Sequence, residues 1–503
     1  MKRPAALLWP WLIVAATGIA VWLLVFRPAP HVSGSLRHEV YVWQRAWTEP
    51  VRKAVEQQGT NFSALAVLKA EVSWKDRKPQ VAWVAVDYAT LAKTQRQVGL
   101  ALRIGPYSGP FASPSPPLKE ERAGERGSSH SNSINGTDSS PLSPTLSPLG
   151  RGEGVNTKRD PALATASQGT NDPKAPAPLR SAGAVQDAPG EAITTFLCDL
   201  AASLVAEARS NHVNLSELQI DFDCAESKLD GYRVWMEAMQ RRVAPLPVTI
   251  TALPSWLDSR AFKRLAAVAT NYVLQVHSVE RPRSFNAPFT LCDPRAARRA
   301  VERAGRIGIP FRVALQTYGY TLAFDPAGKF IGLSAEGARP NWPPNALLRE
   351  VHSDPLELAA LVQDWTASRP AVMRGVIWYR LPTMVDNFNW RWPTLGAIII
   401  ARVPREVLRV SARRVESGLV EISLANEGEL DISSRLAVEV RWSKARLVAG
   451  DALRDFELAD RSLSAARFQT KSQPGRVRVG ETLVLGWLRF DQDCEVRCEL
   501  KKL

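Results

Sequence analysis

The chain has 503 residues, of which 45% are hydrophobic and 23% are charged. This composition is typical of a globular protein and excludes a fully disordered chain, and the length exceeds that of one ordinary domain. The formal net charge of +14 is compatible with nucleic acid or an anionic surface. Much of that charge is arginine scattered through helical stretches, however, and there is no nucleic-acid-binding motif, so we predict no nucleic acid partner.

The first segment is apolar. Met1-Lys2-Arg3 precede an uncharged, mostly apolar stretch at residues 5–26, which at ~1.5 Å per residue is long enough to span a bilayer of ~30 Å. The apolar core of a cleaved signal peptide is shorter, usually ~7 to 15 residues. We therefore expect residues 1–30 to form a signal-anchor in a single-pass bacterial inner-membrane protein, with the soluble body in the periplasm. A cleaved signal peptide is the alternative.

Eight short apolar runs, rich in β-branched residues, recur with helical spacing between almost every pair. The runs are residues 40–45, 65–74, 98–104, 217–223, 247–252, 272–278, 311–318 and 375–379, and the clearest helical patterns are residues 193–208, 229–242, 293–304 and 354–366. Such repeated alternation predicts an α/β fold, a (β/α)8 TIM-type barrel over residues 38–112 and 191–402.

The barrel sequence is interrupted after its third strand. Residues 113–190 are rich in Pro, Ser, Gly and Asn and lack apolar periodicity, so we predict a disordered low-complexity insert. From residue 403 to residue 503 the pattern changes to short β segments at residues 407–410, 419–424, 436–442 and 483–490. This pattern predicts a C-terminal β-sandwich-like domain that packs on the barrel or binds a partner.

Five cysteines make an odd number, so at least one is expected to be free or to pair outside the chain. Cys494 and Cys498 are too far apart for a disulfide in an extended strand. Cys224 and Cys292 both fall in predicted loops at one rim of the barrel, which makes them a candidate pair.

The sharpest chemical motif is the run from Leu218 to Glu226. Alternate residues of a strand share a face, so Asp221 and Asp223 are expected to point together into the barrel interior. Two neighbouring carboxyl groups raise one another's proton affinity, and glycosidic cleavage needs one protonated acid and one ionised partner. The sequence therefore predicts Asp221, Asp223 and Glu226 as catalytic residues. The alternative is a structural carboxylate network satisfied by Arg45, Lys69 or Arg103.

Other polar and aromatic residues fall at or near the ends of the predicted strands, where barrel enzymes carry their active sites. His277 is the only histidine at such an end; it could assist proton transfer, contact substrate, ligate a metal with Asp221 and Asp223, or simply be hydrogen-bonded. Aromatic residues at the rim, including Trp47, Trp74 and Trp256, could each belong to a carbohydrate cleft or to a packed core, and taken as a set they favour the cleft. The predicted substrate-binding residues are Trp43, Arg45, Glu71, Arg103, Gln275, His277, Gln316, Tyr318, Trp378 and Tyr379.

Several segments resemble an uncharacterised bacterial domain-of-unknown-function family. They are Tyr41-Val-Trp-Gln-Arg-Ala-Trp, Leu102-Arg-Ile-Gly-Pro, Asp221-Phe-Asp-Cys-Ala-Glu-Ser-Lys, Ile250-Thr-Ala-Leu-Pro-Ser-Trp, Tyr272-Val-Leu-Gln-Val-His and Ile377-Trp-Tyr-Arg-Leu-Pro. This resemblance supports the architecture and implies no reaction.

The fourth strand is distantly similar to that of the chitinase-like family 18 glycoside hydrolases. In that family an Asp-x-Asp-x-Glu pattern ends the strand and a tryptophan closes the eighth strand, as Trp378 could here. Asp221 and Asp223 match the aspartates of this pattern. The position of the family's acid is Ala225 in this chain, and Glu226 is displaced by one residue.

These observations favour an envelope glycoside hydrolase that cleaves a polysaccharide and needs no cofactor. A catalytically silent glycan-binding barrel with a scaffold role in the cell envelope is the first alternative, and a metal-dependent hydrolase is the second. The oligomeric state does not follow from the sequence.

Overall fold

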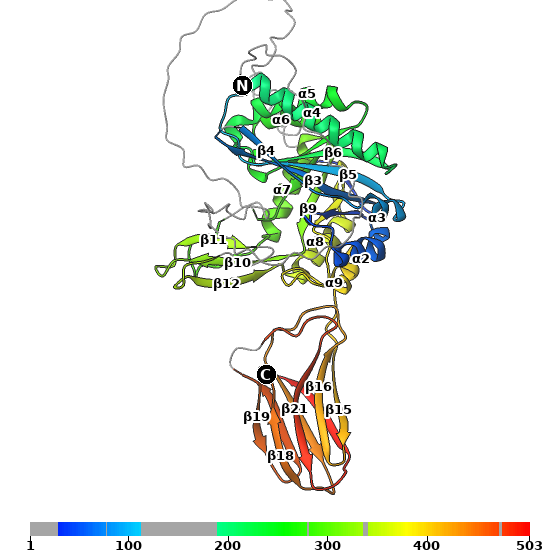
Figure 1. Ribbon diagram of the computed structural model, residues 1–503, viewed down its shortest axis with the longest axis vertical. Coiled ribbons are helices and arrows are strands. Elements are labelled where there is room, and N and C mark those ends of the chain that lie inside the picture. Colours follow the sequence, from blue (N-terminus) through cyan, green and yellow to red (C-terminus); the bar gives the residue numbers. More distant parts are fainter. Residues whose placement is uncertain (1–28, 77, 112–188, 279–280, 335–340, 472–474) are drawn as a thin grey trace, which may run out of the picture.

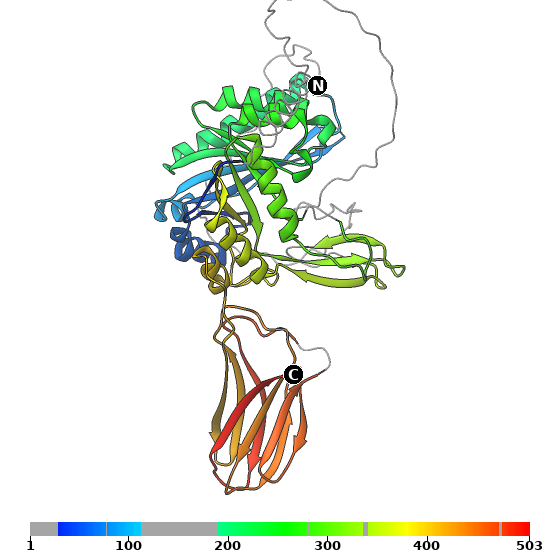
Figure 2. The ribbon, with the colours of Figure 1, turned by 180° about the vertical axis from the view of Figure 1, so that it is seen from behind.

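The computed structural model describes residues 29–76, 78–111, 189–278, 281–334, 341–471 and 475–503. It shows a barrel surrounded by helices, a small sheet that projects from the side of the barrel, and a separate body of antiparallel strands (Figure 1). The same three parts are visible from behind in Figure 2.

Eight parallel strands form the barrel, and each overlaps one of the predicted apolar runs. They are β2 (Arg37–Val42), β3 (Ala64–Lys75), β5 (Gln97–Ile104), β6 (Leu215–Phe222), β7 (Val248–Ala252), β8 (Tyr272–Gln275), β9 (Phe311–Gln316) and β14 (Met373–Tyr379). Neighbouring strands pair in this order, and β14 pairs with β2 to close the barrel. The predicted TIM-type barrel is thus confirmed. Strand β4 (Lys78–Trp83) folds back antiparallel on β3, and β1 (His31–Val32) pairs with β13 (Arg369–Pro370).

Side chains of β6 alternate between the helix layer and the barrel interior. Phe222 points outward, and its ring centroid lies 5.0 Å from that of Tyr232. Glu217 and Asp221 instead contact side chains of other barrel strands across the interior. The polar side chains of β6 therefore point into the barrel interior, where the candidate site lies.

Helices connect most of the strands and cover the outside of the barrel. They are α2 (Glu49–Gln58), α3 (Tyr88–Lys93), α4 (Pro189–Ser210), α5 (Leu229–Val243), α6 (Arg260–Ala269), α7 (Pro294–Ile307), α8 (Pro355–Ala367) and α9 (Trp392–Ile399), with short 3-10 helices η2 (Gly59–Asn61), η3 (Glu226–Lys228) and η4 (Pro254–Trp256). The four predicted helical stretches correspond to α4, α5, α7 and α8.

Two of these helices begin at an Asp-Pro pair. The carboxylate of Asp354 accepts hydrogen bonds from the backbone N–H groups of Leu356 and Glu357 at 2.8 and 3.3 Å. Pro355, in the first turn, has no N–H to satisfy. Asp293 caps α7 in the same way. These caps fix where each helix starts and hence the length of the loop before it.

An antiparallel sheet that the sequence did not predict follows β9. Its strands are β10 (Gly319–Phe324), β11 (Phe330–Ser334) and β12 (Leu347–His352), with β10 in the centre. The guanidinium of Arg349 on β12 donates to the carbonyls of Phe285 and Ala287 at 2.9 and 2.7 Å. The sheet leaves the barrel at the carboxyl end of β9 and so stands beside the barrel mouth.

The C-terminal part is a sandwich of two four-stranded antiparallel sheets, as predicted. One sheet has the order β15 (Leu408–Glu416), β16 (Leu419–Asn426), β21 (Thr482–Phe490) and β18 (Leu447–Ala452); the other has the order β19 (Phe456–Arg461), β20 (Ala465–Thr470), β17 (Leu436–Trp442) and β22 (Val496–Lys502). Ile422, Val438, Phe468 and Leu485 are fully buried between the sheets. The sequence identified β15, β16, β17 and β21 and missed the other four strands.

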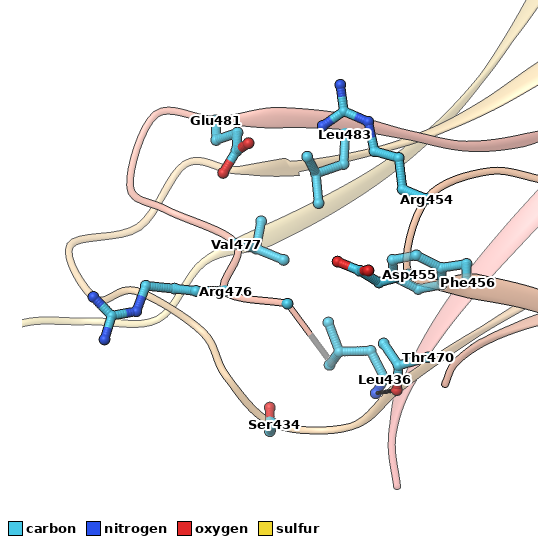
Figure 3. Close-up of a pocket in the computed structure, with 11 residues that line it drawn as sticks. Ser434, Leu436, Arg454, Asp455, Phe456, Thr470, Arg476, Val477, Glu481 and Leu483 are labelled. Carbon is cyan, nitrogen blue, oxygen red and sulfur yellow. Dashed lines mark hydrogen bonds between the residues drawn. The ribbon is translucent and has the colours of Figure 1, made fainter. Parts of the chain in front are cut away.

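A pocket of about 90 Å³ opens in the sandwich (Figure 3). Its lining combines the apolar side chains of Leu436, Phe456, Val477 and Leu483 with Ser434, Arg454, Asp455, Thr470, Gly475, Arg476 and Glu481. Positive and negative groups are both present, and none of the predicted site residues lines it. The pocket is therefore separate from the site that the sequence predicts in the barrel.

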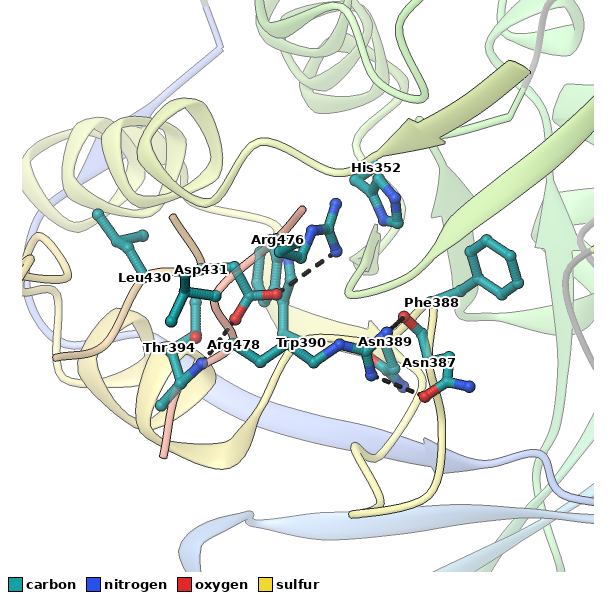
Figure 4. A network of polar contacts seen from close by, with 12 residues as sticks. His352, Asn387, Phe388, Asn389, Trp390, Thr394, Leu430, Asp431, Arg476 and Arg478 are labelled. Carbon is teal, nitrogen blue, oxygen red and sulfur yellow. Dashed lines mark hydrogen bonds and ion pairs between the residues drawn. The ribbon is translucent and has the colours of Figure 1, made fainter. Parts of the chain in front are cut away.

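The sandwich meets the barrel through a polar junction (Figure 4). Arg478 donates to the side-chain oxygen of Asn387 at 2.7 Å and to the Asn387 carbonyl at 3.3 Å. Asp431 accepts from the backbone N–H of Val479 at 2.9 Å and pairs with Arg476 at 3.4 Å. The loop of residues 476–479 is thus held by Asp431 within the sandwich and by Asn387 on the barrel side.

Asn387 belongs to a segment after β14, residues 386–390, which we call the bridging segment. Asp386 accepts from the backbone N–H groups of Phe388 and Asn389 at 3.0 and 3.2 Å and forms an ion pair with Arg380. The backbone N–H of Trp390 donates to the carbonyl of Thr317 at 2.8 Å. The bridging segment therefore connects the carboxyl ends of β14 and β9 to the sandwich.

The predicted single-pass inner-membrane location is corrected by the structure. Within the ranges it describes, no helix is long and apolar enough to cross a membrane. Helix α4 has sufficient length, but it carries Glu191, Asp199, Glu207 and Arg209, which are costly in a bilayer. The predicted signal-anchor lies almost wholly in residues 1–28, and the predicted insert in residues 112–188, which are outside the described residues.

The candidate disulfide between Cys224 and Cys292 is also wrong, because all five cysteines are free. Cys224 follows β6, whereas Cys292 precedes α7 in the loop after β8, so strand β7 separates the two loops. Burial raises the pKa of each of these two thiols to about 12. Both are therefore protonated, buried side chains at neutral pH.

Candidate active site

Polar side chains of three neighbouring strands lie side by side at the carboxyl end of the barrel. Glu71 of β3 is the register partner of Arg103 of β5, and Arg103 is the register partner of Asp221 of β6. Asp223 follows directly after the end of β6. TIM-type barrels carry their active sites at this end of the strands. Four of the predicted site residues are therefore close together.

A β-bulge turns Glu71 toward this interior row. The register between β3 and β5 shifts between Leu68 and Ala70, so Lys69 is an extra residue in β3. The ammonium of Lys69 lies 2.8 Å from the carboxylate of Glu207 on α4, outside the barrel. Because alternate residues share a face, Glu71 would face the helix layer if the strand were regular.

Two arginines join three carboxyl groups in what we call the mouth cluster. Arg103 donates to Asp221 at 3.2 Å and to Asp223 at 2.7 Å. Arg45 donates to both oxygens of Glu71 at 2.6 and 3.0 Å, and the Nε of Arg103 lies 4.0 Å from Glu71. Three ionised carboxylates would outnumber the two guanidinium groups, so the cluster favours keeping one proton.

The proton is held most readily by Asp223. Burial raises the pKa of Asp223 to about 6; the charge of Arg103 opposes this rise and that of Asp221 adds to it. Asp221 accepts hydrogen bonds on both oxygens, since the hydroxyl of Thr251 donates to its Oδ1 at 2.8 Å. The side chains of Asp221 and Asp223 are 13% and 12% exposed, so both can be reached from the barrel mouth.

A buried polar network supports the mouth cluster from below. Tyr41 donates to Gln219 at 2.8 Å, and Gln219 donates to Glu217 at 2.5 Å. Arg312 donates to both oxygens of Glu217 at 2.8 Å, and Thr249 donates at 2.6 Å. Burial acts to raise the pKa of Glu217, but Arg312 and the hydrogen bonds hold it below its usual value. The network fixes β6 against β2, β7 and β9, and so positions Asp221.

A small hollow opens beside Asp221, with a volume of about 20 Å³, enough for roughly one water molecule. It is lined by Tyr41, Trp43, Asp221, Thr251, Gln275, His277, Ala314 and Tyr379. The indole N–H of Trp43 and the hydroxyl of Tyr379 are buried and have no hydrogen-bond partner among the described residues. Both residues therefore line the hollow and carry a polar group whose hydrogen-bonding capacity is unused in this part of the chain.

The other predicted rim tryptophans do not line the hollow. Trp43 packs against Tyr379 with a centroid distance of 5.4 Å, but the indole of Trp74 donates to the carbonyl of Gly105 and packs on Tyr107. Trp47 is buried, and Trp256 is buried against Phe262. Trp43 and Tyr379 thus line the hollow, whereas Trp47, Trp74 and Trp256 do not.

His277 belongs to a buried cluster of hydroxyl groups. Its Nδ1 lies 3.2 Å from the hydroxyl of Tyr318, and the hydroxyl of Ser278 lies 2.9 and 3.0 Å from those of Tyr318 and Tyr320. Burial lowers the pKa of His277 to about 3. The imidazole is therefore neutral near pH 7 and can exchange hydrogen bonds but cannot act as a cation.

Two predicted glutamines lie in the same region. Gln275 donates to the carbonyl of His277 at 3.1 Å and lines the hollow. Gln316, the last residue of β9, is buried, and its Oε1 has no hydrogen-bond partner among the described residues. Sequence reasoning missed Tyr41 and Thr251, although Tyr41 shares the face of Trp43 by strand alternation.

Two predicted site residues lie elsewhere. Glu226 begins η3 and is exposed, and no hydrogen bond joins it to Asp221 or Asp223 in the described part of the chain. Trp378 points out of the barrel, where its indole donates to Nδ1 of His38 at 3.1 Å. Because β14 alternates, the neighbouring Tyr379 occupies the interior position expected for Trp378.

The described residues contain no group of three His, Cys, Asp or Glu side chains that could hold a metal ion. His277 therefore has no ligand set with Asp221 and Asp223 in this part of the chain, which leaves the metal-dependent alternative without structural support.

The chain is thus a TIM-type barrel, with the mouth cluster at the carboxyl ends of its strands, followed by an antiparallel sandwich. Residues 191–384 match a family model described as Domain of unknown function (DUF3142), and residues 409–491 match one described as Domain of unknown function (DUF8456). These matches confirm the predicted resemblance to a domain-of-unknown-function family. No curated protein matches the chain.

Several solved structures resemble the chain at low identity. The spore cortex-lytic enzyme SleL of Bacillus megaterium QM B1551 is 12% identical over 74% of this chain and 75% of that chain, with a TM-score of 0.42. A chitinase from Chromobacterium violaceum ATCC 12472 is 11% identical over 73% and 98%, with a TM-score of 0.41. A chitinase from Bacteroides thetaiotaomicron is 10% identical over 70% and 93%, with a TM-score of 0.38. These values assign no residue role and no substrate to this chain.

Proposed function

We propose that the barrel is a glycoside hydrolase that cleaves a polysaccharide, with Asp223 as the general acid and Asp221 as its ionised neighbour. The observation that carries this proposal is the placement of Asp221 and Asp223 on the one guanidinium of Arg103 at the barrel mouth, and the raised pKa of Asp223 supports it. A carboxyl group that stays protonated near neutral pH can protonate a leaving glycosidic oxygen. A nearby carboxylate stabilises the positive charge that develops on the sugar ring.

The surroundings of the pair suit a carbohydrate. Trp43 and Tyr379 present aromatic surface together with an unpartnered N–H and hydroxyl, a combination that contacts both the C–H bonds and the hydroxyl groups of a sugar. The hollow is too small for a whole sugar ring, so we place the ring above it with one substituent inserted. Arg45, Gln275 and Gln316 would contact neighbouring hydroxyls.

The test is turnover of a panel of peptidoglycan, chitin-like and exopolysaccharide substrates by the parent protein and by Asp223→Asn. Asparagine keeps the shape of the side chain but cannot donate the proton, so we expect kcat to fall ~10²- to 10⁴-fold. Asp230→Asn is the matched control, because Asp230 pairs with Arg264 on the outside of the barrel. Turnover by the parent together with full activity in Asp223→Asn would overturn the assignment of the acid.

A catalytically silent glycan-binding barrel is the second candidate. It is favoured by the small volume of the hollow and by Ala225, which stands at the acid's position in the Asp-x-Asp-x-Glu pattern, while the neighbouring Glu226 is exposed. This candidate predicts no turnover on any substrate, but calorimetric binding of an oligosaccharide that Trp43→Ala weakens. Turnover by the parent protein would exclude it.

A further inference from the structure

The mouth cluster contains a third carboxyl group, Glu71, to which the proposed function has so far given no role. Glu71 stands in the same register row as Arg103 and Asp221, and only the bulge at Lys69 brings it to the interior face. Its side chain is 15% exposed, close to the values for Asp221 and Asp223. Glu71 is therefore as open to the mouth as the two aspartates.

We propose that Glu71 is the second catalytic carboxylate, the general base that activates the hydrolytic water, and that it replaces Glu226 among the predicted catalytic residues. This inference rests on the proposed glycoside hydrolase function and assigns the partner of Asp223.

The charges around Glu71 suit this role. Arg45 holds both of its oxygens, and Arg103 lies between it and Asp223. Arg45 and Arg103 thus place two cations beside Glu71, whereas burial and the charge of Asp221 raise the pKa of Asp223. A carboxylate held by two cations and a carboxyl group with a raised pKa suit the two roles that hydrolysis needs.

The guanidinium of Arg103 also separates the two groups in space. One end of it lies 2.7 Å from Asp223, and its Nε lies 4.0 Å from Glu71. The proposal therefore gives Glu71 the role of a base that acts through a water molecule, as in inverting hydrolases.

The step balances as a simple hydrolysis. Glu71 accepts a proton from water while the water oxygen bonds to the anomeric carbon. The glycosidic C–O bond breaks, its electron pair stays on the leaving oxygen, and that oxygen takes the proton of Asp223. One water is consumed and two hydroxyl-bearing products form. A proton passes from Glu71 to Asp223 through solvent to restore the starting state.

The experiment compares Glu71→Gln with Glu56→Gln and Glu226→Gln on a glycan that the parent protein cleaves. Glu56→Gln is the matched control, because Glu56 of α2 pairs with Lys93 at the surface, away from the bulge. We expect Glu71→Gln to lower kcat ~10²- to 10⁴-fold and Glu56→Gln to leave it within about twofold. A loss in Glu226→Gln, with activity retained in Glu71→Gln, would overturn the proposal.

Glu71→Gln also removes a partner of Arg45, so a melting curve accompanies each variant, and Arg45→Met is measured as well. Arg45→Met keeps the carboxylate but removes the two hydrogen bonds that orient it, so kcat should fall by less than in Glu71→Gln. A fall in kcat that only follows the fall in melting temperature in both variants would mean that Glu71 only maintains structure. Absence of turnover by the parent would refute the proposed function itself, and is thereby distinguished from a wrong assignment of the base.

Discussion

The guanidinium of Arg103 lies 2.7 Å from the carboxyl group of Asp223, yet the pKa of Asp223 is raised rather than lowered. An arginine at this distance normally favours the ionised carboxylate. Here the same guanidinium also binds Asp221, and the carboxyl group is buried. Burial and the second negative charge together outweigh the ion pair. The pKa of Asp223 is raised for this reason, and the rise has measurable consequences.

The first is a dependence of stability on pH. Because the folded barrel raises the pKa of Asp223 to about 6, it holds this proton more tightly than the unfolded chain does. The contribution is fully present below about pH 4 and is lost as pH rises through about 6, by about 3 kcal/mol in all. Urea unfolding of the barrel between pH 4 and pH 7 measures it, and Asp223→Asn should lack this part of the slope. An identical slope in the variant would show that Asp223 does not titrate in this range.

The second prediction concerns the network beneath the mouth. Arg312→Met leaves Glu217 and Glu39 buried without their shared cation, so we expect the free energy of unfolding to fall by about 3 to 5 kcal/mol. Arg298→Met is the control, since its pair with Asp364 is exposed and should contribute less than about 1 kcal/mol. Equal losses in chemical denaturation would show that the buried network does not stabilise the barrel.

The third prediction separates binding from stability. Tyr379→Phe removes a hydroxyl that has no partner among the described residues, so the melting temperature should not change. Affinity for a bound glycan should fall roughly 5- to 10-fold through loss of one hydrogen bond. Tyr41→Phe, which breaks the bond to Gln219, should instead destabilise the fold by about 1 kcal/mol. Unchanged glycan affinity in Tyr379→Phe would place the sugar away from the hollow.

The fourth prediction addresses the junction. Arg478→Ala removes both hydrogen bonds to Asn387, so amide hydrogens of the bridging segment should exchange faster, as measured by mass spectrometry. Arg409→Ala, which affects an exposed pair on β15, should leave that segment unchanged. Equal exchange in both variants would mean that the barrel alone holds the segment in place.

The barrel could be predicted because strand and helix patterns alternate and differ clearly in period. The direction of Asp221 also followed from the alternation of β6. Glu71 could not be placed in the same way, because the bulge at Lys69 shifts the alternation by one residue and depends on pairing with β5. Local sequence does not determine such a shift.

Two further differences have identifiable physical causes. Trp378 was assigned to the mouth by resemblance, although alternation along β14 favours Tyr379, the residue that lines the hollow. The sheet of β10 to β12 was missed because β10 begins only three residues after β9 ends, at Gly319 and Gln316. A nearly continuous apolar run conceals that break.

Through the bridging segment, unfolding of the sandwich on heating would affect the barrel mouth. One end of this segment is held by Arg478 of the sandwich, and the other is joined to Arg380 and Thr317 beside the hollow. If the sandwich melts first, the wall of the mouth loses an anchor while the eight strands remain paired. Thermal inactivation would then precede barrel unfolding, and the heat resistance of the site would be set by a domain that contributes no residue to it.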